Sequence, residues 1–309
     1  MRTITRALVP SALLVFGITT AAAAQVSLLL KTQEGTSNVT TSVNVKQVLT
    51  IAGMDVPTES HVTSRAQVTT SKPAADGTQR VEEKTVGFTI RLSTPVGNLD
   101  YDIEKPDPKA GEGTPLQPIV EGFNALKGLA YTVVIKDGKA TGVEGVADAL
   151  SKVPAASVES LKQQLNPETI KREWQQHFDA LPGKPVKKGD TWNRTEVMNL
   201  GAGQSLTYEV QYEYQDPIQK NGRSLDKVSI VFTSVKYALE GPALGGLKVV
   251  SSDLKVDQSF GQYLLDRELG TIVERSTNVH ITGPMVFEIN GQQLPGKVDL
   301  SLDLSSITR

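Results

Sequence analysis

The chain has 309 residues, with 32 Lys and Arg, 34 Asp and Glu, three His and no Cys. The absence of cysteine excludes disulfides, thiolate metal sites and a cysteine nucleophile. The nearly balanced charge argues against a protein that holds nucleic acid, because such proteins need a basic face. A hydrophobic content of 39% is ample for a packed core at this length.

Residues 1–24 have the pattern of an export signal. Arg2 and Arg6 precede the apolar stretch ALVPSALLVFGITTAAAA, whose end offers an Ala-x-Ala cleavage site. We expect cleavage between Ala24 and Gln25. An uncleaved membrane anchor is the alternative, because the stretch is about 18 residues long. No cysteine follows it, so the chain is not expected to be a lipoprotein.

Cleavage would also change the charge of the chain. The leader holds two arginines and no acidic residue, so the remainder has 30 Lys and Arg, 34 Asp and Glu and a net charge of −4. This further weakens a nucleic-acid function. No later stretch has the roughly 20 apolar residues that a membrane-spanning helix needs. We therefore predict an exported protein in the periplasm or at the cell surface, without a transmembrane segment after cleavage.

Apolar and polar residues alternate with a period of two along much of the chain. Because neighbouring side chains of a strand point to opposite faces, this pattern predicts strands with one buried and one solvent-exposed face. One-sided strands of this kind are typical of antiparallel sheets. The apolar positions of the four clearest examples are Leu206, Tyr208, Val210, Tyr212 and Tyr214; Val298, Leu300, Leu302 and Leu304; Val86, Phe88, Ile90 and Leu92; and Tyr131, Val133 and Ile135.

Four dipeptides between the predicted strands have the chemistry of tight turns. Asp-Gly and Asn-Gly pairs tolerate the positive φ angles that two-residue hairpin turns require. Their presence predicts β-meanders. The pairs are Asp76-Gly77, Asp137-Gly138, Asn221-Gly222 and Asn290-Gly291.

Residues 144–181 depart from this pattern and predict two helices. Asn166-Pro167 separates them, as an N-cap followed by proline in the first helical turn, and Pro182-Gly183 ends the second. Each helix has apolar residues at helical spacing. These are Val158, Leu161 and Leu165 in the first, and Ile170, Trp174, Phe178 and Leu181 in the second.

Together, these patterns predict a mainly β protein. Its antiparallel sheets would form two curved halves, as a sandwich or as half-barrels, joined by a short helical connector. The predicted boundaries are 1–24 for the leader, 25–143 for the N-terminal β-half, 144–181 for the connector and 182–309 for the C-terminal β-half.

The segment LPGKPVKKGDTWN, residues 181–193, is the most distinctive in the chain. It resembles a segment of a family of uncharacterised bacterial envelope proteins, in which it follows a short helical region and opens a strand. The matching residues are Pro182, Pro185, Val186, Gly189, Asp190 and Trp192. The resemblance implies a secreted β-fold without an assigned activity, and it brings no catalytic residues. From the residues alone, Trp192 is expected to anchor the core, with ligand stacking as the alternative.

The sequence carries no motif that predicts catalysis. His61, His177 and His280 are far apart, so no local pair presents two imidazoles to one metal. The chain lacks a G-x-S-x-G nucleophile elbow, and its S-x-x-K matches fall in strand-like sequence without their usual partner motifs. Glycine–lysine pairs are not followed by Ser or Thr, as a phosphate-binding loop requires. We therefore expect no cofactor, no metal and no enzymatic activity.

Three functions remain open. The first is a binding or carrier module that encloses an apolar small molecule or lipid between curved sheets. The second is a structural or interaction component of the cell envelope with a protein partner, and the third is a hydrolase whose residues form no sequence motif. Candidate ligand-binding residues are Tyr208, Tyr212, Tyr214 and Trp192, although a closed core would use the same side chains.

Overall fold

A computed structural model describes residues 25–107, 109–151, 153, 162, 165–201, 203–239 and 247–309. The predicted leader lies outside the described residues, as does most of the first predicted helix. No helix among the described residues is long and apolar enough to cross a membrane.

The described residues contain fourteen strands. They are β1 (Gly35–Ile51), β2 (Met54–Thr70), β3 (Gln79–Thr94), β4 (Gly97–Asp102), β5 (Ala130–Lys136), β6 (Lys139–Glu144), β7 (Thr191–Gly201), β8 (Gln204–Tyr214), β9 (Ile218–Lys220), β10 (Arg223–Leu239), β11 (Lys248–Ser252), β12 (Lys255–Asp266), β13 (Thr271–Ile289) and β14 (Gln292–Thr308). All strand pairs are antiparallel. The mainly β, antiparallel fold predicted from the sequence is confirmed.

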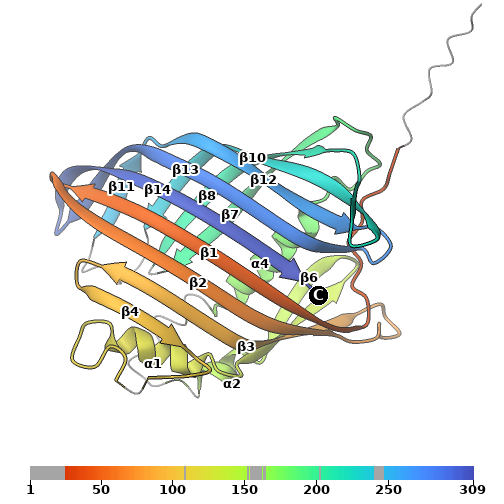
Figure 1. The fold of residues 1–309 in the computed structure, drawn as a ribbon, viewed down its shortest axis with the longest axis horizontal. Helices are drawn as coiled ribbons and strands as arrows, with labels where there is room; N and C mark the ends of the chain where they lie inside the picture. The colour runs from red at the N-terminus through yellow and green to blue at the C-terminus, as the bar shows by residue number, and fades with distance from the viewer. Residues whose placement is uncertain are drawn as a thin grey trace, which may run out of the picture.

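One large open sheet holds the strands, in the order β6-β5-β3-β2-β1-β14-β13-β12-β10-β8-β7. Strands β4, β9 and β11 pair beside this path with β3, β10 and β13. Because β1 pairs with β14 from Val39–Thr308 to Ile51–Gly296, strands from both ends of the chain meet in the middle of the sheet. Figure 1 shows β1, β2 and β14 crossing in front, with β7 and β8 behind them.

The predicted turns form as hairpins. Asp137-Gly138, Asn221-Gly222 and Asn290-Gly291 have positive φ at both positions, as the tightest hairpin turns require. In the fourth pair only Gly77 has a positive φ. The Asn290-Gly291 turn therefore fixes the register of β13 and β14, which places the apolar residues of β14 on one face.

One strand changes phase, which the sequence did not predict. A bulge opposite Arg65 and Ala66 inserts an extra residue in β3, so the alternation shifts between Thr85 and Phe88. Val86 was predicted to share a buried face with Phe88 and is instead 44% exposed. The bulge turns its side chain to the outside.

The sheet curls so strongly that side chains of β1 and β8 contact each other. Gln47 of β1 donates a hydrogen bond to Gln204 of β8 at 3.3 Å, although four strands separate β1 and β8 in the sheet. The main hydrophobic core fills this side of the interior, between β7, β8, β10, β12, β13, β14 and β1. The sheet is thus an incomplete barrel with a concave inner face.

Helices occupy the open side. They are α1 (Gln117–Ala125), α2 (Val146–Leu150) and α4 (Pro167–Asp179). The second predicted helix is confirmed as α4, because the side chain of Asn166 accepts a hydrogen bond from the Glu168 N–H as an N-cap. The sequence did not predict α1, which packs Phe123 against Phe88 of β3 at a ring distance of 4.8 Å.

Helix α4 bridges the two outer strands of the sheet. The side-chain amide of Gln176 pairs with Val197 of β7, accepting from its N–H at 2.7 Å and donating to its C=O at 3.0 Å. The neighbouring Gln175 accepts from the N–H of Ala140 in β6 at 3.1 Å. The helix therefore satisfies backbone groups on both edges that would otherwise be open to another strand.

The segment that precedes β1 crosses one end of the incomplete barrel. Val26 pairs with Val186, Leu28 is buried in the main core, and the Lys31 N–H donates to the Gly270 carbonyl at 2.8 Å. A β-carbon at Gly270 would lie 2.5 Å from the Lys31 side chain, so only glycine permits this approach. Residues 25–34 thus close the barrel end at the β12–β13 turn.

Replacing Gln176 by Ala removes both hydrogen bonds to Val197. We expect the free energy of unfolding to fall by about 1–3 kcal/mol, because a half-buried N–H and C=O are left without partners. Urea denaturation measures this. The exposed Arg172 on the same helix gives the control, Arg172→Ala, with an expected change within about 0.5 kcal/mol. Equal stability of the two variants would contradict the bridging role of α4.

Candidate functional site

The concave interior is divided rather than filled by one continuous core. The main cluster lies under β7 to β14 and β1, a second lies between β3, β5, β6 and α4, and a third lies between β3, β4 and α1. A single domain ordinarily builds one contiguous core. Here the buried apolar residues form three separate clusters, and inward-facing side chains lie at the borders between them.

Apolar side chains that face this space keep accessible surface. The strand register places the inward positions at odd numbers in β1 and even numbers in β2. The half-buried apolar residues at the borders of the three clusters are Val43 and Val45 on β1, Val62 and Val68 on β2, Phe88 and Leu92 on β3, Phe123 on α1, and Trp174 and Phe178 on α4. An amphipathic or apolar molecule would find its contact surface here.

A row of polar side chains crosses this otherwise apolar face. Register pairs Arg275 of β13 with Ser306 of β14, Ser306 with Thr41 of β1, and Thr41 with Ser64 of β2. All four point inward and are only partly buried. The hydroxyl of Thr41 donates to that of Ser306 at 3.2 Å. Nearer the β1–β2 turn most inward positions are apolar, as at Leu304, Val43 and Val62, although Gln47, Thr58 and Ser60 are polar.

Arg275 stands at one end of the row and forms an ion pair with Glu196 of β7 at 3.2 Å. The Tyr212 hydroxyl also donates to the Glu196 carboxylate. Burial acts to lower the pKa of Arg275, yet the carboxylate of Glu196 beside it raises that pKa above its ordinary value on balance. Arg275 is therefore a permanent positive charge on the inner face.

Two buried polar atoms at this place lack a hydrogen-bond partner. Within the described ranges, these are Nε of Arg275 and Oγ1 of Thr277. The two residues point inward from the same strand, one position apart on that face. An unsatisfied buried polar group costs about 1–3 kcal/mol, so a further polar atom at this point would stabilise the protein.

Helix α4 supplies titratable groups to the same interior. His177 keeps accessible surface, yet the surrounding protein desolvates the ring and, together with the charge of Arg275, lowers its pKa to about 4. Glu173 shows the same combination, since it is accessible while burial raises the pKa of its carboxyl. Both side chains are thus accessible to solvent, while the surrounding protein shifts the pKa of each away from its ordinary value.

The residues singled out in the sequence lie elsewhere in the interior. Trp192 stacks on Tyr212 with ring centres 5.5 Å apart and donates its indole N–H to the Ala180 carbonyl. Tyr208 and Tyr214 are likewise buried in the main core. All four line the filled side of the barrel, whereas the recess is formed by other residues. Their ligand-binding role stays a prediction.

Sequence reasoning missed Arg275, Glu196 and Glu83. A signal was present for each, because a charged residue sits in phase with inward apolar positions. Arg275 alternates in step with Val279 and Ile281, and Glu83 alternates in step with Val81. In contrast, His61 and His280 point to the convex side, where His280 contacts Asp299 at 2.9 Å.

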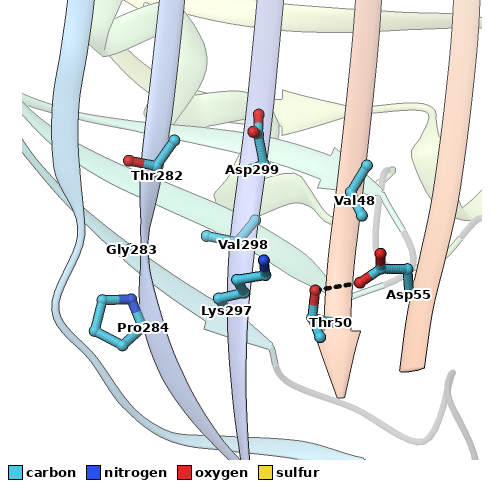
Figure 2. A pocket seen from close by; sticks show the side chains of 9 residues that line it. All are labelled: Val48, Thr50, Asp55, Thr282, Gly283, Pro284, Lys297, Val298 and Asp299. Atoms are coloured by element: carbon cyan, nitrogen blue, oxygen red, sulfur yellow. Dashed lines mark hydrogen bonds between the residues drawn. The ribbon is translucent and has the colours of Figure 1, made fainter. Parts of the chain in front are cut away.

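The convex side carries a shallow depression of about 550 Å³ over β13, β14, β1 and β2 (Figure 2). Its outward-facing side chains include Lys297, Asp299 and Asp55, and Asp55 accepts a hydrogen bond from Thr50 at 2.5 Å. Figure 2 shows these side chains lying along the strands rather than converging on one point. Among the described residues, no cluster of His, Asp and Glu is arranged to hold a metal ion.

Comparison with known proteins identifies a family likeness over part of the chain. Residues 76–221 match a family of unknown function, DUF6263. This range includes residues 181–193, the distinctive segment of the sequence. No curated protein matches the chain.

Solved structures give distant similarities. A lipovitellin structure, described as showing lipid–protein interactions, is 12% identical with a TM-score of 0.41 and covers 90% of this chain and 25% of its own. OccK7 (OpdD) of Pseudomonas aeruginosa is 8% identical with a TM-score of 0.21, covering 89% and 99%. The translocator domain of the autotransporter NalP from Neisseria meningitidis is 7% identical with a TM-score of 0.21, covering 89% and 88%. The chain spans about a quarter of lipovitellin, and similarities at these scores assign no function.

We expect the imidazole of His177 to titrate near pH 4. The reason is that the surrounding protein and the positive Arg275 both disfavour its charged form. Proton–nitrogen correlation spectra recorded between pH 3 and 8 measure this, and His177→Gln assigns the signal among the three histidines. A midpoint at the ordinary value of about 6.5 would show that the ring is fully solvated.

The Glu83 carboxyl should make stability depend on pH. Burial raises its pKa, although Tyr131 and Trp174 beside it partly oppose the shift. The folded state therefore holds this proton more tightly, and the resulting stability is present at low pH and lost as pH rises through the folded pKa. Glu83→Gln should raise Tm relative to the unmodified protein at pH 7 and change it little at pH 4.

The matched control is Glu82→Gln, because Glu82 is the next residue along β3 and is exposed on the outer face. This variant should leave Tm unchanged at both pH values. A Glu83→Gln effect that is equal at pH 4 and pH 7 would argue against a buried, ionising carboxyl.

Proposed function

We propose that this protein is a non-catalytic, extracytoplasmic binding or carrier protein that holds an apolar or amphipathic small molecule, such as a lipid, on its concave face. The observation that carries the proposal is the accessible apolar surface between three separate core clusters. Covering apolar surface releases about 25 cal/mol per Å². A ligand that covers these inward apolar side chains would therefore be held by the burial of apolar surface.

The ends of the incomplete barrel differ in a way that supports this use. Residues 25–34 close one end, at Gly270. At the other end, Met54 and Val56 lie at inward positions beside the β1–β2 turn and are 69% and 37% exposed. Exposed apolar side chains at the rim of an apolar recess are what a ligand entrance requires.

The structural or interaction role remains a second candidate because of the convex face. Phe260 of β12 is 58% exposed and Val231 of β10 is 41% exposed, and the two residues follow directly on the last registered pair, Ile230 and Gly261. Two adjacent apolar side chains on an otherwise polar face favour contact with another protein. Crosslinking through a reactive group placed at Val231 tests this candidate separately from ligand binding.

The proposed function is tested by purifying the full chain from producing cells without detergent and analysing an organic extract by mass spectrometry. A lipid present in a constant molar ratio supports the proposal. A chain that carries none and also fails to bind the neutral apolar probe N-phenyl-1-naphthylamine contradicts it.

Replacing Ser60 by Phe should weaken binding of that probe. Ser60 points inward between Val45 and Leu92 and is partly accessible, so the larger side chain occupies the recess. We expect at least a fivefold loss of affinity, or about 1 kcal/mol. Thr63→Phe is the control, because Thr63 lies on the outer face of the same strand. This variant should bind the probe as tightly as the unmodified protein does. Equal affinities would contradict the placement of the ligand.

A further inference from the structure

The polar row described above crosses the concave face between the end covered by residues 25–34 and the end at the β1–β2 turn. Ser64, Thr41, Ser306 and Arg275 follow one another across four adjacent strands, while the rows between them and the β1–β2 turn are largely apolar. From Ser64 to Val56 on β2, eight residues span about 26 Å. A ligand that lies along this path meets polar groups at its inner end and apolar groups along the rest.

Arg275 is the cation placed to meet that inner end. Its neighbour Arg194 is also inward, but it already donates to the carbonyl oxygens of Asp179 and Leu181 at 2.8 and 3.3 Å. Among the described residues, Arg275 donates a hydrogen bond only to Glu196, and its buried Nε has no partner. Arg275 therefore has guanidinium N–H groups available for a further hydrogen bond, whereas those of Arg194 already bind backbone carbonyls.

Thr277 provides the second, independent sign of a missing partner. It is 4% exposed, and its hydroxyl has no hydrogen bond. Gly261 of β12 packs closely against it, because a β-carbon at Gly261 would lie 3.2 Å from that hydroxyl. An oxygen-bearing group that reached Arg275 would lie within the same corner of the recess. A hydroxyl can donate to such an oxygen, as a guanidinium does.

From this placement we propose that Arg275 and Thr277, together with the hydroxyls of Ser306 and Thr41, bind the anionic headgroup of an amphiphile whose hydrocarbon chain lies along the apolar rows of β1 and β2. The proposal rests on the proposed carrier function and names its ligand class. Carboxylate and phosphate headgroups share the required chemistry, which is several oxygen acceptors carrying negative charge.

Glu196 sets the selectivity of this subsite. Its carboxylate neutralises Arg275 in the empty protein and receives the Tyr212 hydroxyl, so the pair alone has no net charge. An incoming anion competes with Glu196 for the guanidinium. Without a bound anion, Arg275 is paired with Glu196, so no buried charge is left unpaired.

Equilibrium displacement of N-phenyl-1-naphthylamine from the full chain compares hexadecanoate, hexadecyl phosphate and hexadecanol, with acetate and inorganic phosphate as headgroups without a chain. We expect both anionic amphiphiles to bind at least about tenfold tighter than the alcohol, as hydrogen bonds to charged groups allow. Acetate and inorganic phosphate should displace no probe.

Three variants assign this preference to residues. Thr277→Val keeps the side-chain shape and removes a hydroxyl without a partner, so the fold should be retained and hexadecanoate should bind about threefold to tenfold more weakly. Arg275→Met combined with Glu196→Gln removes both charges and should abolish the preference for hexadecanoate over hexadecanol. Glu196→Gln alone removes the competing anion and should tighten hexadecanoate binding without changing that of hexadecanol.

The histidines locate the bound headgroup. Hexadecanoate should shift the imidazole signals of His177, which faces Arg275, and leave those of His61 and His280 on the outer face unchanged. If hexadecanol shifted the His177 signals by the same amount, the shift would not report an anionic headgroup at Arg275, and this placement of the headgroup would be wrong.

Each contrary outcome has its own meaning. If acid and alcohol bind equally, the headgroup subsite is wrong and the carrier function stands. If no amphiphile or probe binds, the carrier function fails and the subsite with it. If acetate or phosphate binds near Arg275 as tightly as hexadecanoate, the site serves a free anion, and the assignment to an amphiphile is overturned.

Discussion

The rest of the structure depends on the two side-chain amides by which α4 holds the edges of the sheet. An open sheet of this length has two rows of unpaired backbone groups and would tend to pair with other chains or to close on itself. Gln176 satisfies one residue of β7 and Gln175 satisfies one of β6. A helix is wider than a strand, so α4 lies between β6 and β7 and these two edge strands do not pair with each other.

This spacing explains why the interior holds three clusters instead of one. On the side where β8 approaches β1, tyrosines and leucines meet and exclude solvent. On the side spanned by α4, the side chains of β1, β2 and β3 reach inward but have no facing strand to meet. The largest cluster of buried residues lies on the side where β8 approaches β1, and the inward side chains of β1 and β2 keep more accessible surface.

The fold could be predicted from the sequence because its signals are local. Alternation in β8 and β14, glycine-containing turns and the Asn166 cap each depend on a few neighbouring residues. The phase shift at Val86 could not be predicted, since the bulge arises from the pairing of β3 with β2. The pairing of Arg275 with Glu196 is also invisible in the sequence, because 79 positions separate them and only the curl of the sheet brings them together.

The pairing of β1 with β14 makes the central seam of the sheet from the first and last strands of the chain. Thr41 and Ser306, whose hydroxyls meet across this seam, are 265 positions apart. During synthesis β1 can pair with β2 early, but its pairing with β14 requires the last strand of the sheet to be made. Contacts between such distant segments form slowly, and a waiting strand edge is prone to misassembly. The curved sheet is therefore completed only when β14 has been made, and a product truncated before β14 lacks the strand that joins β1 to β13.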